Sequence, residues 1–288
     1  MTNQTPHIIA CTDGSGYATS VYDHAAWASR RIEAGVEALH VLDQKRPASG
    51  SVDFSGAMRV DEREDLLTHL ADLDAAQAKV AQIQGRAILD HAVQYLRDKG
   101  VADVQSTLRH GTLVEALHDL EAHTRLIVIG KRGHSADFDH LHLGGKLERV
   151  IRASARPVLV ASRAFKPIKR VLIAYDGSPS AEKAISHAIE KPLLKGLSVH
   201  LLMVGANTDA HLSSLHAAQE KLKAAGVNVA ASLEAGDAET VISKTVAKDG
   251  IDLLVVGAYG HSRVRQLIVG STTTALIRTC LVPLLMFR

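Results

Sequence analysis

The chain has 288 residues, which is long for one small domain and suits two domains of roughly 140 to 150 residues each. Its formal net charge of +2 and its aromatic content of 3% exclude the strong positive field and the stacking rings that nucleic-acid binding needs. No apolar run reaches the roughly 20 residues that cross a bilayer, and the first residues lack the order of a signal peptide. We therefore expect a cytoplasmic protein with neither a nucleic-acid nor a membrane partner.

The first half of the chain opens with an apolar run that starts at His7 and leads into an Asp-Gly-Ser triplet at Asp13, which predicts a strand. A second apolar segment ends at Val41 and is followed by a stretch with no counterpart in the second half. Residues 44–63 are rich in Gly, Ser, Pro and charge and predict a mobile loop. Apolar residues at helical spacing then predict that the next helix is lengthened. These residues are Leu66, Leu70, Leu73, Val80, Ile83 and Ala87.

The second half repeats the first. The Asp-Gly-Ser triplet returns at Asp176, and the apolar run that leads into residues 130–133 returns before residues 257–260. An arginine and a proline near the end of each half also match, at the same spacing. These are Arg152 with Pro157 and Arg278 with Pro283. Three matched blocks in the same order indicate a duplication, with domains at 1–163 and 168–288 and a short basic joint between them.

Short apolar runs of strand length alternate with segments of helical period, which indicates parallel strands linked by crossover helices. In the second half we expect strands near residues 170–175, 197–204, 227–233, 253–256 and 282–287. Asp209 and Asp237 stand where helix N-caps are expected. Each half is therefore predicted to be an α/β domain with a doubly wound, five-stranded parallel sheet of Rossmann-like type. Such sheets usually bind ligands beyond the carboxyl ends of their strands.

The fourth predicted strand of the second half leads into Gly257-x2-Gly260-x9-Gly270-Ser271-Thr272, with a helix predicted to begin at the last three residues. Glycines let backbone N–H groups come close to an anion, and a helix N-terminus adds free donors and a favourable dipole. Ser271 could cap the helix or donate its hydroxyl to a phosphate oxygen. Asp176 ends the first strand at the same sheet edge and could accept a hydrogen bond from a ribose hydroxyl. The pattern predicts a site with a phosphate end and a sugar end.

Each of these features also has a simpler interpretation. Glycines after a strand are common in ordinary turns and helix caps, and Asp176 could simply cap the turn into the next helix. The spaced third glycine, Ser271 and the strand-end aspartate together favour the phosphate site. The Gly-Lys pair at Gly145 is not a Walker loop, because it lacks the following Ser or Thr and the first glycine.

The aspartate after the first strand, the position at the end of the second strand and the G-x2-G-x9-G-[S/T] motif resemble the universal stress protein family. The resemblance covers nearly the whole chain, twice. It implies ATP as the ligand of the second half, with Mg²⁺ as a candidate companion and ADP or AMP as alternatives. It implies ribose and adenine contacts from Asp176 and Val204, and phosphate contacts from Gly257, Gly260, Gly270, Ser271 and Thr272. Met203 stands where the family usually has His, and Thr272 where it often has Val, but neither change removes a backbone donor.

The first half departs further from the family pattern. The third glycine, Gly144, follows after ten residues instead of nine, and Gly145 replaces the Ser or Thr. The capping hydroxyl is thereby lost. We expect this degenerate site to bind ATP weakly or not at all. The family positions that it keeps are Asp13, His40, Val41, Gly130 and Gly133.

Two polar loops leave alternatives open. A zinc site built from His134, His140 and His142 with Asp137 or Asp139 is conceivable. Its spacing matches no usual ligand pattern and no Cys is near, so a solvated loop is favoured and no metal site is predicted. In the matching loop of the second half, Arg263 and Arg265 could approach the phosphates or could be surface charges.

The sequence shows no catalytic set, because phosphoryl transfer needs a base, a metal-holding acid and a cationic clamp, of which only fragments are present. We expect a stress-response protein that binds nucleotide as its main role, with at most weak ATP hydrolysis. The alternatives are a slow ATPase or kinase-like enzyme and a nucleotide-free oligomeric scaffold.

The last strand of each half, at residues 159–161 and 281–287, is apolar and predicted to lie at a sheet edge. A bare edge invites pairing, and the family resemblance suggests pairing across domains or subunits. We predict an internal pseudo-dimer of the two halves, and a homodimer of chains.

Overall fold

The computed structural model describes residues 6–42, 60–131, 145–257 and 271–288. The elements of the first half are β1 (His7–Cys11), α1 (Ala18–Ile32), β2 (Val36–Leu42), α2 (Val60–Asp98), β3 (Val104–His110), α3 (Leu113–Leu120), η2 (Glu121–His123), β4 (Thr124–Gly130), α4 (Gly145–Ala153) and β5 (Val158–Ala161). Those of the second half are β6 (Arg170–Ala174), α5 (Pro179–Glu190), η4 (Pro192–Leu194), β7 (Ser198–Val204), α6 (Asp209–Ala224), β8 (Asn228–Glu234), α7 (Ala238–Lys248), β9 (Leu253–Gly257), α8 (Ser271–Thr279) and β10 (Leu284–Phe287).

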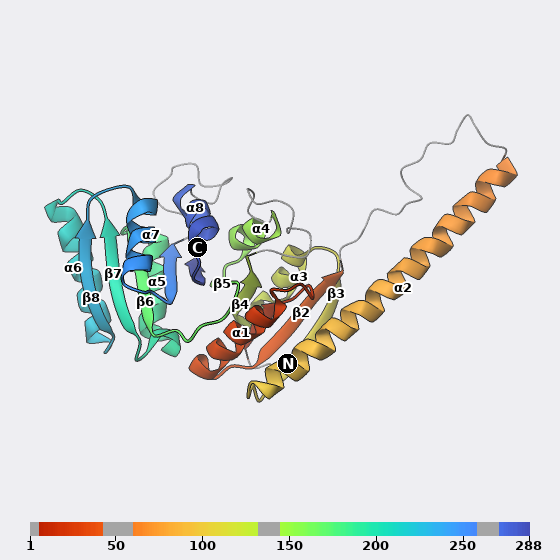
Figure 1. Cartoon of the computed structure of the whole chain (residues 1–288), viewed down its shortest axis with the longest axis horizontal. Coiled ribbons are helices and arrows are strands. Elements are labelled where there is room, and N and C mark those ends of the chain that lie inside the picture. Colours follow the sequence, from red (N-terminus) through yellow and green to blue (C-terminus); the bar gives the residue numbers. More distant parts are fainter. Residues whose placement is uncertain (1–5, 43–59, 132–144, 258–270) are drawn as a thin grey trace.

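The described strands form one sheet in the order β3-β2-β1-β4-β5-β10-β9-β6-β7-β8 (Figure 1). Neighbouring strands within each half run parallel. Each half therefore has a doubly wound order in which its first strand stands at the centre. The predicted fold class is confirmed.

The two halves meet where β5 and β10 pair antiparallel, with Leu159 opposite Leu285. Both side chains are almost completely buried. Each of these strands is the last of its half. The two sheet edges that were predicted to be unpaired therefore pair with one another. This pairing makes the internal pseudo-dimer that we expected.

Helices cover both faces of the sheet. Helices α1, α2, α5 and α6 pack on one core together with Ile8 and Ala10 of β1. Helices α3, α4, α7 and α8 pack on the other core together with Ile9 and Cys11. Because successive side chains of a strand point to opposite faces, a sheet covered on both sides needs strands that are apolar without interruption.

The strands predicted for the second half agree with the observed ones to within two residues at each end. The largest difference is at β10, which begins at Leu284 instead of at residue 282. Pro283 explains the late start, because proline has no N–H to donate to a neighbouring strand.

One of the two predicted N-caps is wrong. Asp237 caps α7 as expected, since its side chain accepts a hydrogen bond from the backbone N–H of Thr240 at 2.9 Å. At α6 the cap is Thr208, whose hydroxyl oxygen accepts from the N–H of His211 at 3.2 Å, and Asp209 is the first helical residue. Thr208 has the extended backbone that a cap requires, and an acidic Asp209 in the first turn still favours the helix dipole.

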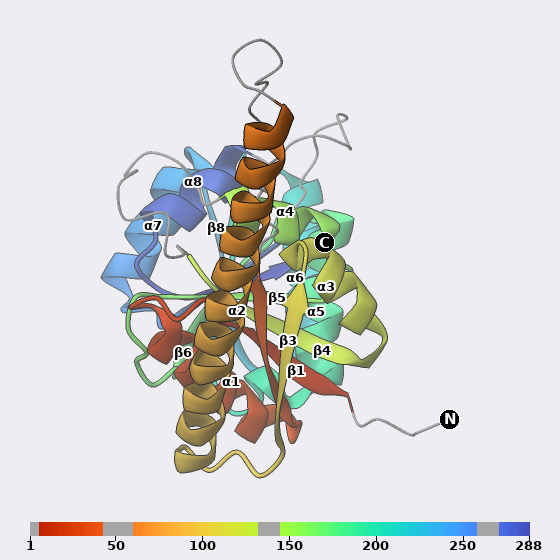
Figure 2. The ribbon, with the colours of Figure 1, turned by 90° about the vertical axis from the view of Figure 1, so that its right-hand side faces the viewer.

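Helix α2 is lengthened as the spacing predicts and has 39 residues. The loop predicted over 44–63 lies outside the described residues up to position 59, and it is wrong for 60–63, which open the helix. Only the end of α2 packs on the sheet, where Leu89, Ala92 and Leu96 are buried. A Cβ at Gly85 would fall 2.9 Å from the Leu108 side chain, so glycine allows the close approach to β3. The rest of α2 runs past the sheet edge (Figures 1 and 2).

Candidate functional site

The order of strands in the second half reverses at β6. Strand β7 lies on one side of β6, with Leu202 opposite Ala174, and β9 lies on the other, with Val256 opposite Ala174. Residues just beyond these pairs therefore share the carboxyl edge of the sheet at the point where ligands of doubly wound sheets bind. Asp176, Val204 and Gly257 are the predicted site residues that the fold brings to this edge.

Asp176 caps the turn that leads into α5. One carboxylate oxygen accepts a hydrogen bond from the backbone N–H of Ser178 at 3.0 Å. Gly177 has a φ of +71°, which favours glycine, and Ser178 caps α5 by accepting from the N–H of Ala181. The Asp176 side chain is nonetheless exposed at the sheet edge. The turn-capping interpretation is therefore correct.

The packing of β9 against α5 requires a glycine at position 257. A Cβ at this position would fall 2.5 Å from the hydroxyl oxygen of Ser180 and 3.1 Å from the backbone nitrogen of Ala181. The end of β9 thus lies directly against the first turn of α5. The close packing requires glycine here whether or not a phosphate binds.

Helix α8 begins at Ser271, where the glycine motif predicts a helix N-terminus. Gly260, Gly270 and the loop arginines Arg263 and Arg265 lie outside the described residues, as do the side chains of Ser271 and Thr272. What the structure describes of the predicted phosphate end is therefore Gly257 and the backbone start of α8.

The predicted sugar end contains residues that the sequence motifs do not include. The hydroxyl of Tyr175, next to Asp176, donates to Glu182 and lies 3.2 Å from the hydroxyl of Ser214. Burial, followed by the hydrogen bond to Glu182, raises the pKa of Tyr175 to about 12. The hydrogen bond from Tyr175 is the main cause that lowers the pKa of Glu182, and Lys221 reinforces it at 2.9 Å. The cluster fixes α5 and α6 to the end of β6. A polar residue inside an otherwise apolar strand end is the signal that could have revealed it.

Val204 and its neighbour differ in burial. Val204 is half-buried at the end of β7 and packs on the same core as α7 and α8. Met203 is buried in the opposite core. The methionine that stands where the family usually has histidine is thus a core residue.

The first half repeats the aspartate turn. The carboxylate of Asp13 accepts from the N–H of Ser15 at 3.0 Å, and Gly14 has a φ of +70°. A Cβ at Gly14 would fall 2.7 Å from Ile88 of α2, so this turn lies under an apolar side chain. His40 donates from Nδ1 to the carbonyl oxygen of Thr12 at 2.8 Å.

Of the remaining residues of the degenerate site, Val41 is half-buried near the end of β2, Gly130 ends β4 and Gly145 begins α4. Gly133, Gly144 and the histidine-rich loop lie outside the described residues.

Lys131 joins this part of the first half to the second half. Its ammonium donates to the backbone carbonyl of Cys280, which follows α8. Burial lowers the pKa of Lys131 to about 8. The residue after Gly130 thus contacts the opposite domain.

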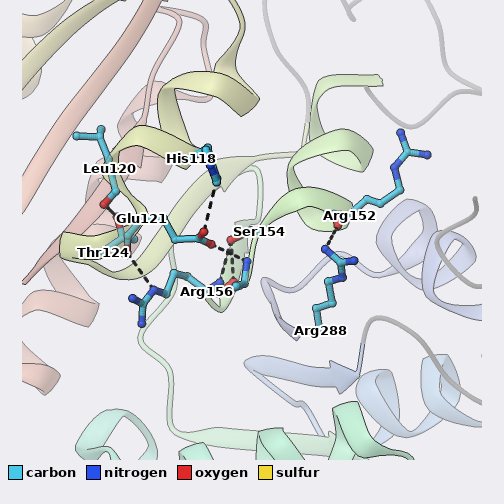
Figure 3. A network of polar contacts seen from close by, with 9 residues as sticks. His118, Leu120, Glu121, Thr124, Arg152, Ser154, Arg156 and Arg288 are labelled. Atoms are coloured by element: carbon cyan, nitrogen blue, oxygen red, sulfur yellow. Dashed lines mark hydrogen bonds and ion pairs between the residues drawn. The ribbon is translucent and has the colours of Figure 1, made fainter. Parts of the chain in front are cut away.

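The two carboxyl edges lie at opposite ends of the sheet, because β5 and β10 are antiparallel. Arg288, which follows β10, donates to the backbone carbonyl of Arg152 at the end of α4 (Figure 3). Its own carbonyl oxygen accepts from Lys183 of α5 at 2.8 Å. The carboxyl edge of the second half is therefore bordered by residues of the first.

The polar network beside this contact holds the turn before β5. Glu121 accepts from the backbone N–H of Ala155 at 2.7 Å, and Arg156 donates to the carbonyl oxygen of Glu121 at 3.1 Å (Figure 3). Ser154 accepts from the N–H of Arg156 at 3.0 Å. These bonds fix the end of α4 against η2, and with it the carbonyl that Arg288 contacts.

Two cavities in the described part of the chain lie elsewhere. One of about 380 Å³ is lined by Trp27, Arg30, Arg31 and Lys195, and one of about 80 Å³ lies between α3 and α4. Neither includes a predicted site residue. Within the ranges that the structure describes, no three His, Cys, Asp or Glu side chains gather as a metal site. No described helix is both long and apolar enough to span a bilayer.

Comparison with known proteins gives the same family for both halves. The sequence model of the Universal stress protein family matches residues 5–162 and again residues 167–288. A universal stress protein of Synechocystis sp. is 37% identical over 285 residues, which cover 98% of this chain and 99% of that protein. A universal stress protein of Mycobacterium bovis is 25% identical over 230 residues, 71% of this chain and 77% of that one. The crystal structure of a universal stress protein from Archaeoglobus fulgidus has a TM-score of 0.70 at 20% identity, covering 99% of this chain and 97% of its own.

Proposed function

Because the chain belongs to the universal stress protein family, we propose that it is a stress-response protein that binds ATP, or a related adenine nucleotide, in its second half. One observation carries the proposal: α8 begins at Ser271 of the glycine motif, Asp176 lies two residues beyond the end of β6, and Val204 ends the neighbouring strand β7. A helix N-terminus at this edge supplies free N–H donors and a dipole for phosphates.

In this proposal the domains are residues 1–163 and 168–288, and each site residue has a role. Asp176 accepts from the ribose, and Val204 contacts the adenine. The phosphates lie on backbone N–H groups of Gly257, Gly260, Gly270, Ser271 and Thr272, with Mg²⁺ as a candidate companion.

The first half binds nucleotide weakly or not at all and acts as the structural partner of the second. Its last described glycine, Gly145, is the first residue of α4 and offers no hydroxyl to a phosphate, whereas α8 begins with Ser271.

Binding, not turnover, is the proposed role. The only acidic side chain that the sequence motifs supply to the site is Asp176, whose carboxylate accepts from the backbone N–H of Ser178. ATP hydrolysis is accordingly at most weak. The proposed setting is the cytoplasm, and the proposed assembly is a homodimer.

Calorimetric titration with ATP and with AMP tests the proposal. Gly270→Val puts a β-branched side chain where the motif needs backbone close to phosphate, so ATP affinity should fall at least about tenfold. Gly144→Val at the matching position of the first half is the control and should leave ATP affinity within about twofold. Circular dichroism confirms that both variants fold. Unchanged ATP affinity in a folded Gly270→Val variant, or equal losses in both variants, would overturn the proposal.

A further inference from the structure

Helix α2 carries large apolar side chains that are exposed, with no other described element packed on them. Leu73 is 58% exposed, Val80 is 53% exposed and Ile83 is 60% exposed. Together with the exposed Ala76 they recur at alternating steps of three and four residues, which is the spacing of an interface between two helices. We call Leu73, Ala76, Val80 and Ile83 the α2 stripe.

The α2 stripe faces away from the sheet. The side of α2 that packs on the protein is marked by Gly85, Leu89, Ala92 and Leu96, all buried. At 3.6 residues per turn this side lies about 170° around the helix axis from the stripe. The first part of α2 extends past the sheet edge (Figure 1). A partner can therefore reach the stripe without displacing any of the elements that the structure describes.

The charged residues beside the stripe indicate which partner fits it. Asp65 and Asp72 precede stripe positions in the first part of α2, while Lys79 and Arg86 occupy the same heptad position further along. These four residues flank one side of the stripe at intervals of seven. The acidic pair comes first and the basic pair second, so the flank is complementary to its own reversed copy.

We propose that two copies of this chain associate through the α2 stripe, with the two helices antiparallel. With the twofold axis between Asp74 and Ala75, Leu73 of one copy lies opposite Ala76 of the second copy. Val80 lies opposite His69, and Ile83 lies opposite Leu66, both of which precede the stripe on α2. The flanking charges then meet as Asp65 with Arg86 and Asp72 with Lys79, and the twofold axis repeats both pairs.

A parallel pair lacks this complementarity. In a parallel coiled coil each of these flanking residues meets the position five residues later in the partner. The partners would then be uncharged: Leu70 for Asp65, Gln77 for Asp72 and Gln84 for Lys79. Charge complementarity thus favours the antiparallel arrangement.

The strand pairing within one chain also indicates that two copies associate away from the final strands. The pairing of β5 with β10 within one chain occupies both of the final-strand edges, so a second copy cannot pair there. The antiparallel arrangement also separates the two protein bodies, since each lies on the side of its own α2 that faces away from the other helix.

Sedimentation velocity of the full chain over a range of concentrations tests the association. Leu73→Glu with Ile83→Glu places carboxylates in the paired stripes and should raise the dimer dissociation constant at least about tenfold. Both side chains are exposed in the single chain, so the variant should fold. The matched control is Ala75→Glu with Gln82→Glu, which adds the same charge at exposed positions beside the stripe and should change the constant by less than about threefold. A wild-type chain that stays monomeric, or a dimer that is insensitive to the stripe variant, overturns the proposal.

Charge exchange tests the orientation. Asp72→Lys alone places two like-charged pairs in the antiparallel dimer and should weaken it several-fold, up to about tenfold. Adding Lys79→Asp restores opposite charges and should return the dissociation constant to within about twofold of the wild type. Failure of the second substitution to rescue the first contradicts the antiparallel pairing.

Cross-linking gives an independent check of register. Mixed Leu66→Cys and Ile83→Cys chains should form a disulfide between the two variants, whereas Ile83→Cys alone should not, because its two copies lie about 25 Å apart along the helices. The native Cys11 and Cys280 are buried and do not interfere. Self-cross-linking of Ile83→Cys would show a parallel pair and overturn the proposed orientation.

Discussion

At the scale of single residues, Gly257 shows how a motif glycine can serve packing as well as a ligand. Alanine at this position should destabilise the protein by about 1–3 kcal/mol, because its Cβ would overlap the Ser180 hydroxyl and crowd the backbone of Ala181. Denaturant unfolding measures the change. Gly16→Ala is the control, since nothing lies within 4 Å of a Cβ there, and it should stay within about 0.5 kcal/mol. In a Ser180→Ala background, Gly257→Ala should lower the free energy of unfolding by less. A Gly257→Ala variant with unchanged stability would show that the close contact is absent.

His187 makes stability depend on pH. Burial, with a smaller contribution from Lys191, lowers its pKa from 6.5 to about 4, and its ring packs on Phe287 with centroids 5.0 Å apart. As pH falls from 7.5 to 5, the unfolded chain takes up a proton that the folded chain does not. Protonation of His187 in the unfolded chain should therefore lower the free energy of unfolding by about 2 kcal/mol between pH 7.5 and pH 5.

The His187→Gln variant should lose that part of the pH dependence in denaturant titrations at pH 7.5 and pH 5. His216→Gln, at an exposed position on α6, serves as the comparison and should keep the wild-type dependence. An unchanged difference between the two pH values in His187→Gln would contradict the burial of this ring as its cause.

At the scale of elements, the cap of α6 distinguishes the observed structure from the sequence prediction. Thr208→Ala should lower the free energy of unfolding by about 1 kcal/mol, because the N–H of His211 loses its acceptor. Asp209→Ala removes only a favourable charge from the first turn and should cost less, about 0.3–1 kcal/mol. Chemical denaturation of the two variants decides the matter: a larger loss for Asp209→Ala would make Asp209 the cap.

The elements also show what the sequence could predict. Apolar runs bounded by turn residues located the second-half strands, because those strands are covered on both faces. The prediction of Asp209 as the cap of α6 was wrong, because Thr208 can cap as well and only the backbone conformation selects one of them. The apolar spacing of α2 predicted that the helix is lengthened. It did not predict that the stripe faces away from the described sheet, because a core-facing helix has the same pattern.

At the scale of the whole molecule, duplication predicts two carboxyl edges, and the β5–β10 pairing sets them at opposite ends of one sheet. The meeting of Asp176, Val204 and Gly257 at one edge follows from strand order and was predictable. The contacts of Arg288 with Arg152 and of Lys131 with Cys280 were not. They depend on how two halves distant in sequence pack together, which no local pattern encodes.

We propose above that the second half holds an adenine nucleotide on the N-terminus of α8. A crystal structure of the full chain grown with ATP tests it most directly. We predict phosphate density against the backbone of Gly257 and the first turn of α8, ribose density within hydrogen-bond distance of Asp176, and no nucleotide in the first half. Nucleotide density at the first-half edge alone, or ATP-saturated crystals with no nucleotide at the second-half edge, would contradict the claim.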